Sequence, residues 1–232
     1  MNYTEKYGIK MIYNQFAEKV ESDFYDTAEI DLIDIFVKSI LQLKDLDKKE
    51  YTMLELGSNY AYYSMLFKKI LEPTKTLNLC LEPYEKYYNA GVEHFKHNNL
   101  KANFIKKKIF TPAKWGNIVL DCDQVLVDNL LNEHGIDTLD VLHCDIDGAE
   151  VLALETTKEF LTKNKINFLF ILTHAGMLGN TEPARHHPLG SDFLHNEVKR
   201  ILESYGYVLT SEFSDWSVGN DGLVVFKREV LI

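Results

Sequence analysis

One short stretch, residues 52–64, restricts the fold of this chain more than any other. It reads Thr-Met-Leu-Glu-Leu-Gly-Ser-Asn-Tyr-Ala-Tyr-Tyr-Ser. Residues 53–56 are apolar apart from one acid, which is typical of a strand buried on both faces of a parallel sheet. Gly57 follows where the chain must turn, because glycine adopts positive φ freely and lets a ligand approach the backbone. The stretch therefore predicts a strand, a tight turn and a helix whose free N–H groups face a cofactor.

The number of glycines narrows the choice of cofactor. A dinucleotide-binding turn carries three glycines, whereas the later positions here are Asn59 and Ala61. The chain also has no Gly-Lys-Ser/Thr loop for a nucleotide phosphate. S-adenosylmethionine has no phosphate, so one glycine would admit its methionine end, and Glu55 is placed to bind that end. An ordinary turn that binds nothing is the simpler alternative.

Composition excludes several classes of protein. The 232 residues suffice for one substantial core, and the formal net charge of −10 argues against a general nucleic-acid or anionic-membrane surface. Cys80, Cys122 and Cys144 form no Cys-x-x-Cys pair, so we expect neither a zinc site nor a disulfide framework. Cys80 and Cys144 lie in apolar strand patterns and are expected in the core of a reduced, cytoplasmic protein. No window reaches the roughly 18 apolar residues of a membrane span.

Helical and strand patterns alternate along the chain. Residues 1–50 are expected to form an N-terminal helical extension, with its clearest helix at residues 29–43, packed on a domain of residues 51–232. The remaining predicted elements follow in order: strands at 53–56, 76–81, 103–109, 139–145, 166–172, 207–210 and 223–226, and helices at 60–70, 84–98, 125–133, 149–161 and 191–205. This alternation predicts an α/β, doubly wound, mostly parallel sheet that closes with an antiparallel strand.

Acids and histidines follow several of these strands. Glu82 ends the second strand, where a ribose diol would be held, although an acid at the start of the next helix would also be favoured there. Asp145 and His174 follow the fourth and fifth strands, at the edge where open α/β sheets bind ligands. Either could be a general base, or both could hold a divalent cation such as Mg²⁺ or Mn²⁺. A strand-end histidine without a role is an equal alternative for His174.

Other polar groups have simpler explanations. Asp147 and Glu150 have the spacing of a capping box at a helix start. A long polar loop at residues 173–190 carries Arg185, His186 and His187, which could contact an anionic substrate or could simply be exposed. The remaining helical histidines are expected on helix surfaces without a role: His94, His97 and His134.

Several of these motifs together resemble the FkbM-type S-adenosylmethionine-dependent methyltransferases. The turn Glu55-Leu56-Gly57-Ser58-Asn59-Tyr60-Ala61-Tyr62-Tyr63-Ser64 is similar to the family's acid-x-Gly-Ala-Asn-x-Gly-Tyr-Tyr-Ser pattern. Glu82-Pro83, then Val127-Asp128-Asn129-Leu130-Leu131, then residues 139–150 follow in the family's order and spacing. The resemblance covers roughly residues 50–175 and extends to the last strand.

The resemblance implies a fold, a reaction and a site. The fold would be the seven-stranded class I methyltransferase sheet, which is Rossmann-like. The reaction would be methyl transfer to the oxygen of a small acceptor, commonly a sugar or natural-product hydroxyl, as in polysaccharide biosynthesis. The predicted cofactor-binding residues are Glu55, Gly57, Ser58, Asn59, Tyr60, Glu82 and Pro83. An NAD-dependent oxidoreductase and a catalytically silent binding module remain as alternatives.

The chain departs from the family pattern at three positions. Ala61 stands where the family has glycine, His143 replaces a lysine, and Asp147 replaces a glutamate. The first departure leaves cofactor binding expected, with a more crowded helix start. The other two change the charges beside Asp145 and leave the catalytic details open.

Overall fold

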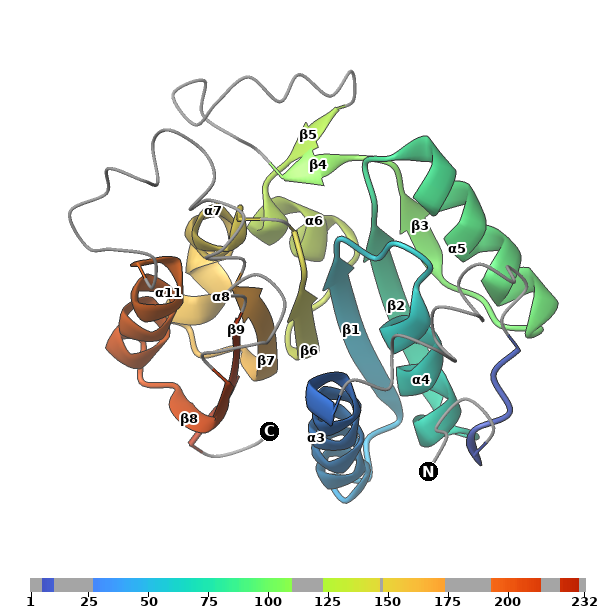
Figure 1. Ribbon diagram of the computed structural model, residues 1–232, viewed down its shortest axis with the longest axis horizontal. Coiled ribbons are helices and arrows are strands. Elements are labelled where there is room, and N and C mark those ends of the chain that lie inside the picture. The colour runs from blue at the N-terminus through green and yellow to red at the C-terminus, as the bar shows by residue number, and fades with distance from the viewer. Residues whose placement is uncertain are drawn as a thin grey trace. The chain divides into compact units, whose positions relative to one another are not determined.

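The computed structural model describes residues 6–10, 27–109, 123–146, 148–173, 193–213 and 222–229 (Figure 1). Backbone contacts divide the chain into two compact units, Met1–Ile105 and Lys106–Ile232. Each unit contains strands of a parallel type with helices packed beside them. We describe the two units in turn.

The first unit contains three parallel strands in the order β3-β2-β1. Its elements are α3 (Thr27–Lys44), β1 (Glu50–Leu56), α4 (Tyr62–Leu71), β2 (Lys75–Leu81), α5 (Glu85–His97) and β3 (Asn103–Ile105). The last pair in the β1–β2 register is Leu56 with Leu81, so both strands end at the same level. Gly57 and Glu82, which come next in the chain, therefore follow neighbouring strand ends.

The second unit contains four strands in the order β6-β7-β9-β8. Its elements are β4 (Lys108–Ile109), β5 (Gln124–Val125), α6 (Val127–Glu133), β6 (Leu139–Cys144), α7 (Glu150–Thr156), α8 (Lys158–Thr162), β7 (Ile166–Thr173), α11 (Phe193–Ser204), β8 (Val208–Phe213) and β9 (Gly222–Lys227). β6 and β7 are parallel, whereas β9 is antiparallel to both β7 and β8. The short strands β4 and β5 pair with each other.

The predicted fold class is confirmed. The three strands of the first unit and the four of the second are the seven of a mostly parallel, doubly wound sheet, and the last strand is antiparallel as expected. Cys80 and Cys144 are free and fully buried, as predicted for core residues. The helix expected at residues 29–43 is α3, and its Phe36 ring packs edge-on against Tyr63 of α4 at a centroid distance of 5.1 Å.

Two predicted elements are divided in the structure. The strand expected at residues 103–109 is two strands, because β3 pairs with β2 while β4 pairs with β5. The helix expected at residues 149–161 is interrupted at Thr157, whose hydroxyl donates to the Ala153 carbonyl at 2.6 Å. A threonine that bonds back to the preceding turn competes with the helical ladder and commonly bends it. Periodicity alone does not reveal either break.

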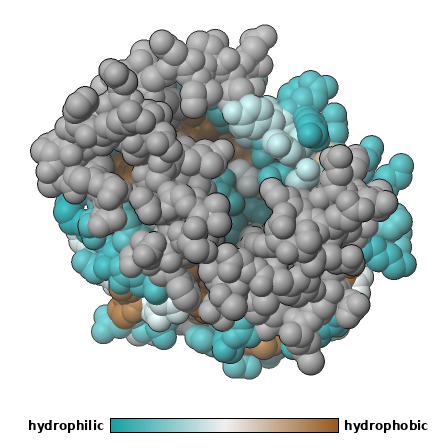
Figure 2. All heavy atoms as spheres, in the orientation of Figure 1, coloured by the Kyte–Doolittle hydropathy of each residue, from teal (hydrophilic) through white to brown (hydrophobic). Residues whose placement is uncertain are grey.

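The surface gives no sign of a bilayer-crossing element. Among the helices that the structure describes, none is both long and apolar enough to cross a membrane. Hydrophilic side chains predominate among the described residues on the face drawn in Figure 2, with small apolar areas between them.

Candidate active site

The turn between β1 and α4 is fastened to the end of β2 by its backbone. The N–H groups of Gly57 and Ser58 both donate to the carbonyl of Leu81, each at 3.0 Å. Gly57 has φ +73°, in the left-handed region that glycine reaches without steric cost. Its lack of a Cβ is therefore required by the backbone conformation of the turn, as the sequence predicted.

Left-handed conformation recurs at two later positions of the turn. Asn59 has φ +46°, which asparagine tolerates, and Ala61 has φ 58° and ψ 37° immediately before α4. For alanine this conformation costs about 1–2 kcal/mol. The departure from the family's glycine therefore has its consequence in the backbone, and the methyl group of Ala61 is fully buried.

Glu82 joins the two strand ends. Its carboxylate is buried, with 4 % of the residue exposed. Oε2 accepts the N–H of Asn59 and Oε1 accepts the N–H of Tyr84, both at 2.9 Å. Each carboxylate oxygen can accept a second hydrogen bond, so capacity for a diol remains. The structure thus brings the predicted ribose-binding acid onto the predicted cofactor turn.

Glu55 and Ser58 face different surroundings. The buried Glu55 carboxylate accepts the N–H of Ser64 at 3.2 Å, in the first turn of α4, where the helix dipole favours an acid. Its binding of the cofactor's methionine end stays a prediction. The Ser58 hydroxyl is buried and has no hydrogen-bond partner within the described part of the chain. A buried hydroxyl of this kind needs a polar partner, which a bound cofactor would supply.

Helix α5 packs closely against the turn. A Cβ placed on Gly91 would lie 2.8 Å from Phe104 Cε1 and 3.1 Å from the Asn59 carbonyl oxygen. One helical turn later, His94 Nδ1 lies 3.3 Å from the Tyr60 carbonyl oxygen. A side chain at position 91 would hold α5 away from the turn, and the glycine permits the contact that places His94.

The prediction that His94 lies on a helix surface without a role is wrong. The residue is fully buried, and burial lowers the pKa of its imidazole against the opposing hydrogen bond to Tyr60. Ala90, Gly91 and Asn98 are also buried and share its helical spacing. That stripe was the available signal, but a histidine and an asparagine within it disguise it.

Asp145 follows β6 directly and is half-buried. The β6–β7 register pairs Cys144 with Ile171, so the two strands deliver their following residues to one edge. Two residues before the strand ends, His143 is buried, and burial lowers its pKa to about 4 although Asp145 opposes the shift. His143 is therefore neutral near pH 7 and, unlike the lysine of the family pattern, places no positive charge beside Asp145.

The other residues assigned from the sequence to this edge lie outside the described residues. They are His174, Asp147, Arg185, His186 and His187. Their roles stay predictions. Within the described ranges, no group of three or more histidine, cysteine or acidic side chains is arranged to hold a metal ion.

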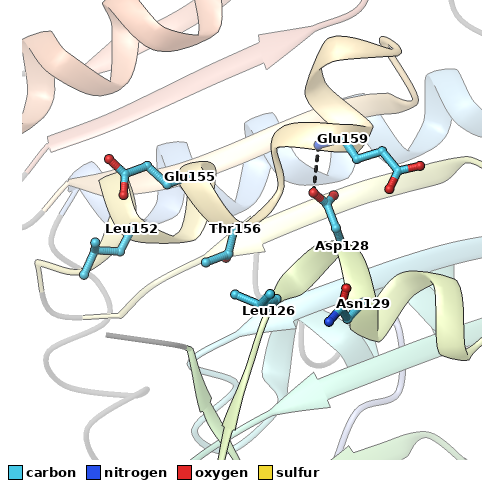
Figure 3. A pocket seen from close by; sticks show the side chains of 7 residues that line it. All are labelled: Leu126, Asp128, Asn129, Leu152, Glu155, Thr156 and Glu159. Carbon is cyan, nitrogen blue, oxygen red and sulfur yellow. Dashed lines mark hydrogen bonds between the residues drawn. The ribbon is translucent and has the colours of Figure 1, made fainter. Parts of the chain in front are cut away.

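Two acids of the second motif bond to backbone N–H groups. Glu150 Oε1 accepts the N–H of Gly148 at 3.0 Å, which is a capping contact at the start of α7. Asp128, on α6, accepts the N–H groups of Glu159 and Phe160 at 2.7 and 3.2 Å and so caps α8 from a neighbouring helix (Figure 3). Burial raises the pKa of Asp128, and these two bonds oppose the rise. The motif's aspartate is explained by helix capping.

A recess of about 340 Å³ lies beside Asp128 (Figure 3). It is lined by Leu126, Asp128, Asn129, Leu152, Glu155, Thr156 and Glu159, from α6, α7, α8 and the residue before α6. None of these residues follows a strand end, so the recess is separate from the edge where open α/β sheets bind their ligands. We assign it no part in the site.

Comparison with known proteins identifies the family. The sequence model of the methyltransferase FkbM domain matches residues 55–209. This match spans the cofactor turn, Glu82, Asp145 and most of the second unit. The chain belongs to the FkbM family of methyltransferases, as the resemblance in its motifs predicted.

Solved structures agree in fold. Fibrillarin from Aeropyrum pernix, in complex with natively bound S-adenosyl-L-methionine, is 13 % identical with a TM-score of 0.50, over 82 % of this chain and 73 % of that one. TrmK from M. capricolum, in complex with S-adenosyl-homocysteine, is 13 % identical with a TM-score of 0.49, over 83 % and 68 %. Precorrin-6y C5,15-methyltransferase from Geobacter metallireducens GS-15 is 8 % identical with a TM-score of 0.49, over 84 % and 86 %. Among curated protein sequences no relative was found.

Proposed function

We propose that this protein transfers the methyl group of S-adenosylmethionine to a hydroxyl of a small acceptor, a carbohydrate or another glycoconjugate or natural-product precursor. Family membership supports methyl transfer. The observation that carries the proposal is the β1–α4 turn, where one glycine, a buried Ser58 hydroxyl without a described partner and the buried Glu82 carboxylate surround the same backbone. Bound there, S-adenosylmethionine would supply an electrophilic methyl group on a positively charged sulfur.

The acceptor side of the proposal rests on Asp145. An aliphatic hydroxyl has a very high pKa, so its proton must be removed as the methyl group arrives. Asp145 is half-exposed at the end of β6, and the neutral His143 beside it contributes no cation to weaken it as a base. His174 is the second proposed base, because it follows β7 directly in the sequence. A negatively charged protein without a general phosphate-binding surface also favours a small acceptor over nucleic acid.

A cation shared by Asp145 and His174 is the alternative to a general base. Of that pair the described residues contain Asp145 alone, and one carboxylate is too few ligands for Mg²⁺ or Mn²⁺. We derive no step through a metal. Turnover that survives a chelator supports the general base, and turnover that requires added Mg²⁺ or Mn²⁺ supports the cation.

The test measures both halves of the proposal. Purified protein is incubated with S-adenosylmethionine and a panel of pyranosides, uronates, phenols and total transfer RNA, and S-adenosylhomocysteine is quantified. We expect turnover with at least one hydroxylated small molecule, and product analysis should find an O-methyl ether. Turnover on transfer RNA alone would replace the proposed acceptor class. Cofactor binding without any turnover would favour the silent module, and NADH binding in its place would favour the oxidoreductase. We retain a reducing, cytoplasmic setting as part of the proposal, supported by the two free buried thiols.

A further inference from the structure

A chain of hydrogen-bonded side chains crosses the second unit at the end of β7. Thr173 Oγ1 and His195 Nδ1 are 2.8 Å apart, and His195 Nε2 is 2.9 Å from Glu212 Oε1. Lys199 Nζ reaches the same Glu212 oxygen at 2.7 Å. We call Thr173, His195 and Glu212 the β7 bridge. Its members come from three elements, β7, α11 and β8, that are separate in the sequence.

The register of the strands explains how the bridge reaches across the sheet. β9 lies between β7 and β8, and it pairs Thr173 with Gly222 and Glu212 with Val224. These four residues share one face, because side chains alternate along each strand. Gly222 carries no side chain, so an imidazole from α11 can lie over β9 and contact both outer strands. The sequence places its glycine where the bridge passes.

Burial and charge give the bridge a direction. Thr173 is fully buried and His195 is 5 % exposed, whereas the Glu212 side chain is 33 % exposed. Hydrogen bonds from Lys199 first and His195 second hold the pKa of Glu212 below its usual range. The carboxylate is therefore ionised near pH 7, and its contact with Nε2 requires a proton on that nitrogen. In neutral His195, Nδ1 then accepts the hydroxyl proton of Thr173, so each bond has one donor and one acceptor.

The bridge holds the end of a strand that leads into the proposed active site. Thr173 is the last residue of β7, and the next residue is His174, to which the sequence assigns a base role. A hydroxyl–imidazole–carboxylate chain stabilises this end far more specifically than apolar packing, since each group accepts only one geometry. A displacement of about 1 Å at a reacting group can lower a rate by about 100-fold. Fixing where β7 ends therefore matters for catalysis.

We propose that Thr173, His195 and Glu212 are positioning residues that fix the carboxyl end of β7 for methyl transfer. This inference rests on the proposed function, because the position matters only if chemistry occurs at that edge. None of the three residues is assigned contact with the acceptor. The role predicts that loss of the bridge lowers kcat while the cofactor affinity and the acceptor KM stay close to those of the wild type.

Two substitutions at Thr173 separate positioning from stability. Thr173→Val keeps the shape but removes the hydroxyl, and Thr173→Ser keeps the hydroxyl but removes a methyl group. We expect kcat to fall about 10- to 100-fold in the Val variant and to remain within about 3-fold in the Ser variant. The assay uses the pyranoside or phenol that the wild type turns over best, at a temperature where calorimetry shows both variants folded. Glu197→Gln is the control for charge on α11, because Glu197 pairs with Arg200 outside the bridge, and it should leave kcat unchanged.

The outcomes distinguish the inference from the proposed function. Unchanged kcat in Thr173→Val, with or without a lower melting temperature, would overturn the positioning role while methyl transfer stands. A wild type that turns over no acceptor would overturn both. Nitrogen-15 NMR of the histidine side chains tests the bridge without any substrate: we expect His195 as the tautomer protonated at Nε2. The tautomer protonated only at Nδ1 would contradict the bridge.

Discussion

The β1–α4 turn and the carboxyl ends of β6 and β7 prepare for binding in different ways. At the turn, backbone conformation matters most, because three residues have positive φ and the Glu82 carboxylate is held by two N–H groups. At the strand ends, side-chain chemistry matters most, because His143 is buried and neutral and Thr173 is tied to an imidazole and a carboxylate. The turn should therefore be sensitive to changes at glycine and alanine, and the strand ends to changes that preserve shape but alter protonation.

The largest effect is expected at Asp145. Asp145→Asn preserves the size of the side chain but removes a base, so kcat should fall about 10²- to 10⁴-fold. Cofactor affinity, measured by calorimetry, should stay within about 3-fold, because the turn lies in the other unit. Asp137→Asn, at an exposed acid shortly before β6, is the matched control. Full activity in Asp145→Asn would remove Asp145 from the mechanism and leave His174 as the base.

His143 should make stability depend on pH. Its pKa is about 4 in the folded protein and near 6.5 when unfolded, so between these values the unfolded chain binds the proton more readily. Stability contributed by neutral His143 is therefore complete above about pH 6.5 and falls as the pH falls toward 4, by up to about 3 kcal/mol.

Urea unfolding at pH 7.5 and pH 5 measures this dependence. His143→Gln cannot titrate and should flatten it, whereas the exposed His134→Gln should retain the wild-type slope. Identical slopes in the wild type and His143→Gln would show that another group is responsible.

Gly91 tests how closely α5 must approach the turn. Gly91→Ala places a Cβ within 3.1 Å of the Asn59 carbonyl oxygen and closer still to the Phe104 ring. Overpacking of this kind costs about 1–3 kcal/mol, and the better helix propensity of alanine offsets up to about 1 kcal/mol of it. We expect a net loss of about 1 kcal/mol in denaturant unfolding, together with weaker cofactor binding. Lys96→Ala, exposed on the same helix, should change neither.

The smallest effect is expected at Ala61. Ala61→Gly relieves the left-handed strain but frees the unfolded chain and removes a buried methyl group, so the net change in stability should be under about 1 kcal/mol. Ala153→Gly is the matched control, because Ala153 is equally buried but helical. It should lose about 1–2 kcal/mol more than Ala61→Gly when both are unfolded in urea. Equal losses would show that the conformation of Ala61 is not strained.

Sequence patterns predicted the parts of this molecule that depend on local physics. The buried strand before Gly57, the acid at Glu82 and the alternation of elements follow from burial, turn geometry and periodicity. The β7 bridge could not be predicted in this way, because its three residues lie on three elements and only the β7–β9–β8 register brings them together. His94 was misassigned for a related reason: its partner, the Tyr60 carbonyl, belongs to a turn 34 residues earlier.

Titration of S-adenosylmethionine into the protein, followed by calorimetry, tests the central claim that the single-glycine turn holds this cofactor. We expect the wild type to bind at about micromolar Kd, near 8 kcal/mol. Gly57→Asp should weaken binding at least about 100-fold, because it adds a side chain at φ +73° where the cofactor approaches. Gly135→Asp, at φ +66° with no atom within 4 Å of the added Cβ, should bind like the wild type. A wild type that releases no heat with S-adenosylmethionine, or a Gly57→Asp variant that binds it equally well, would contradict the account.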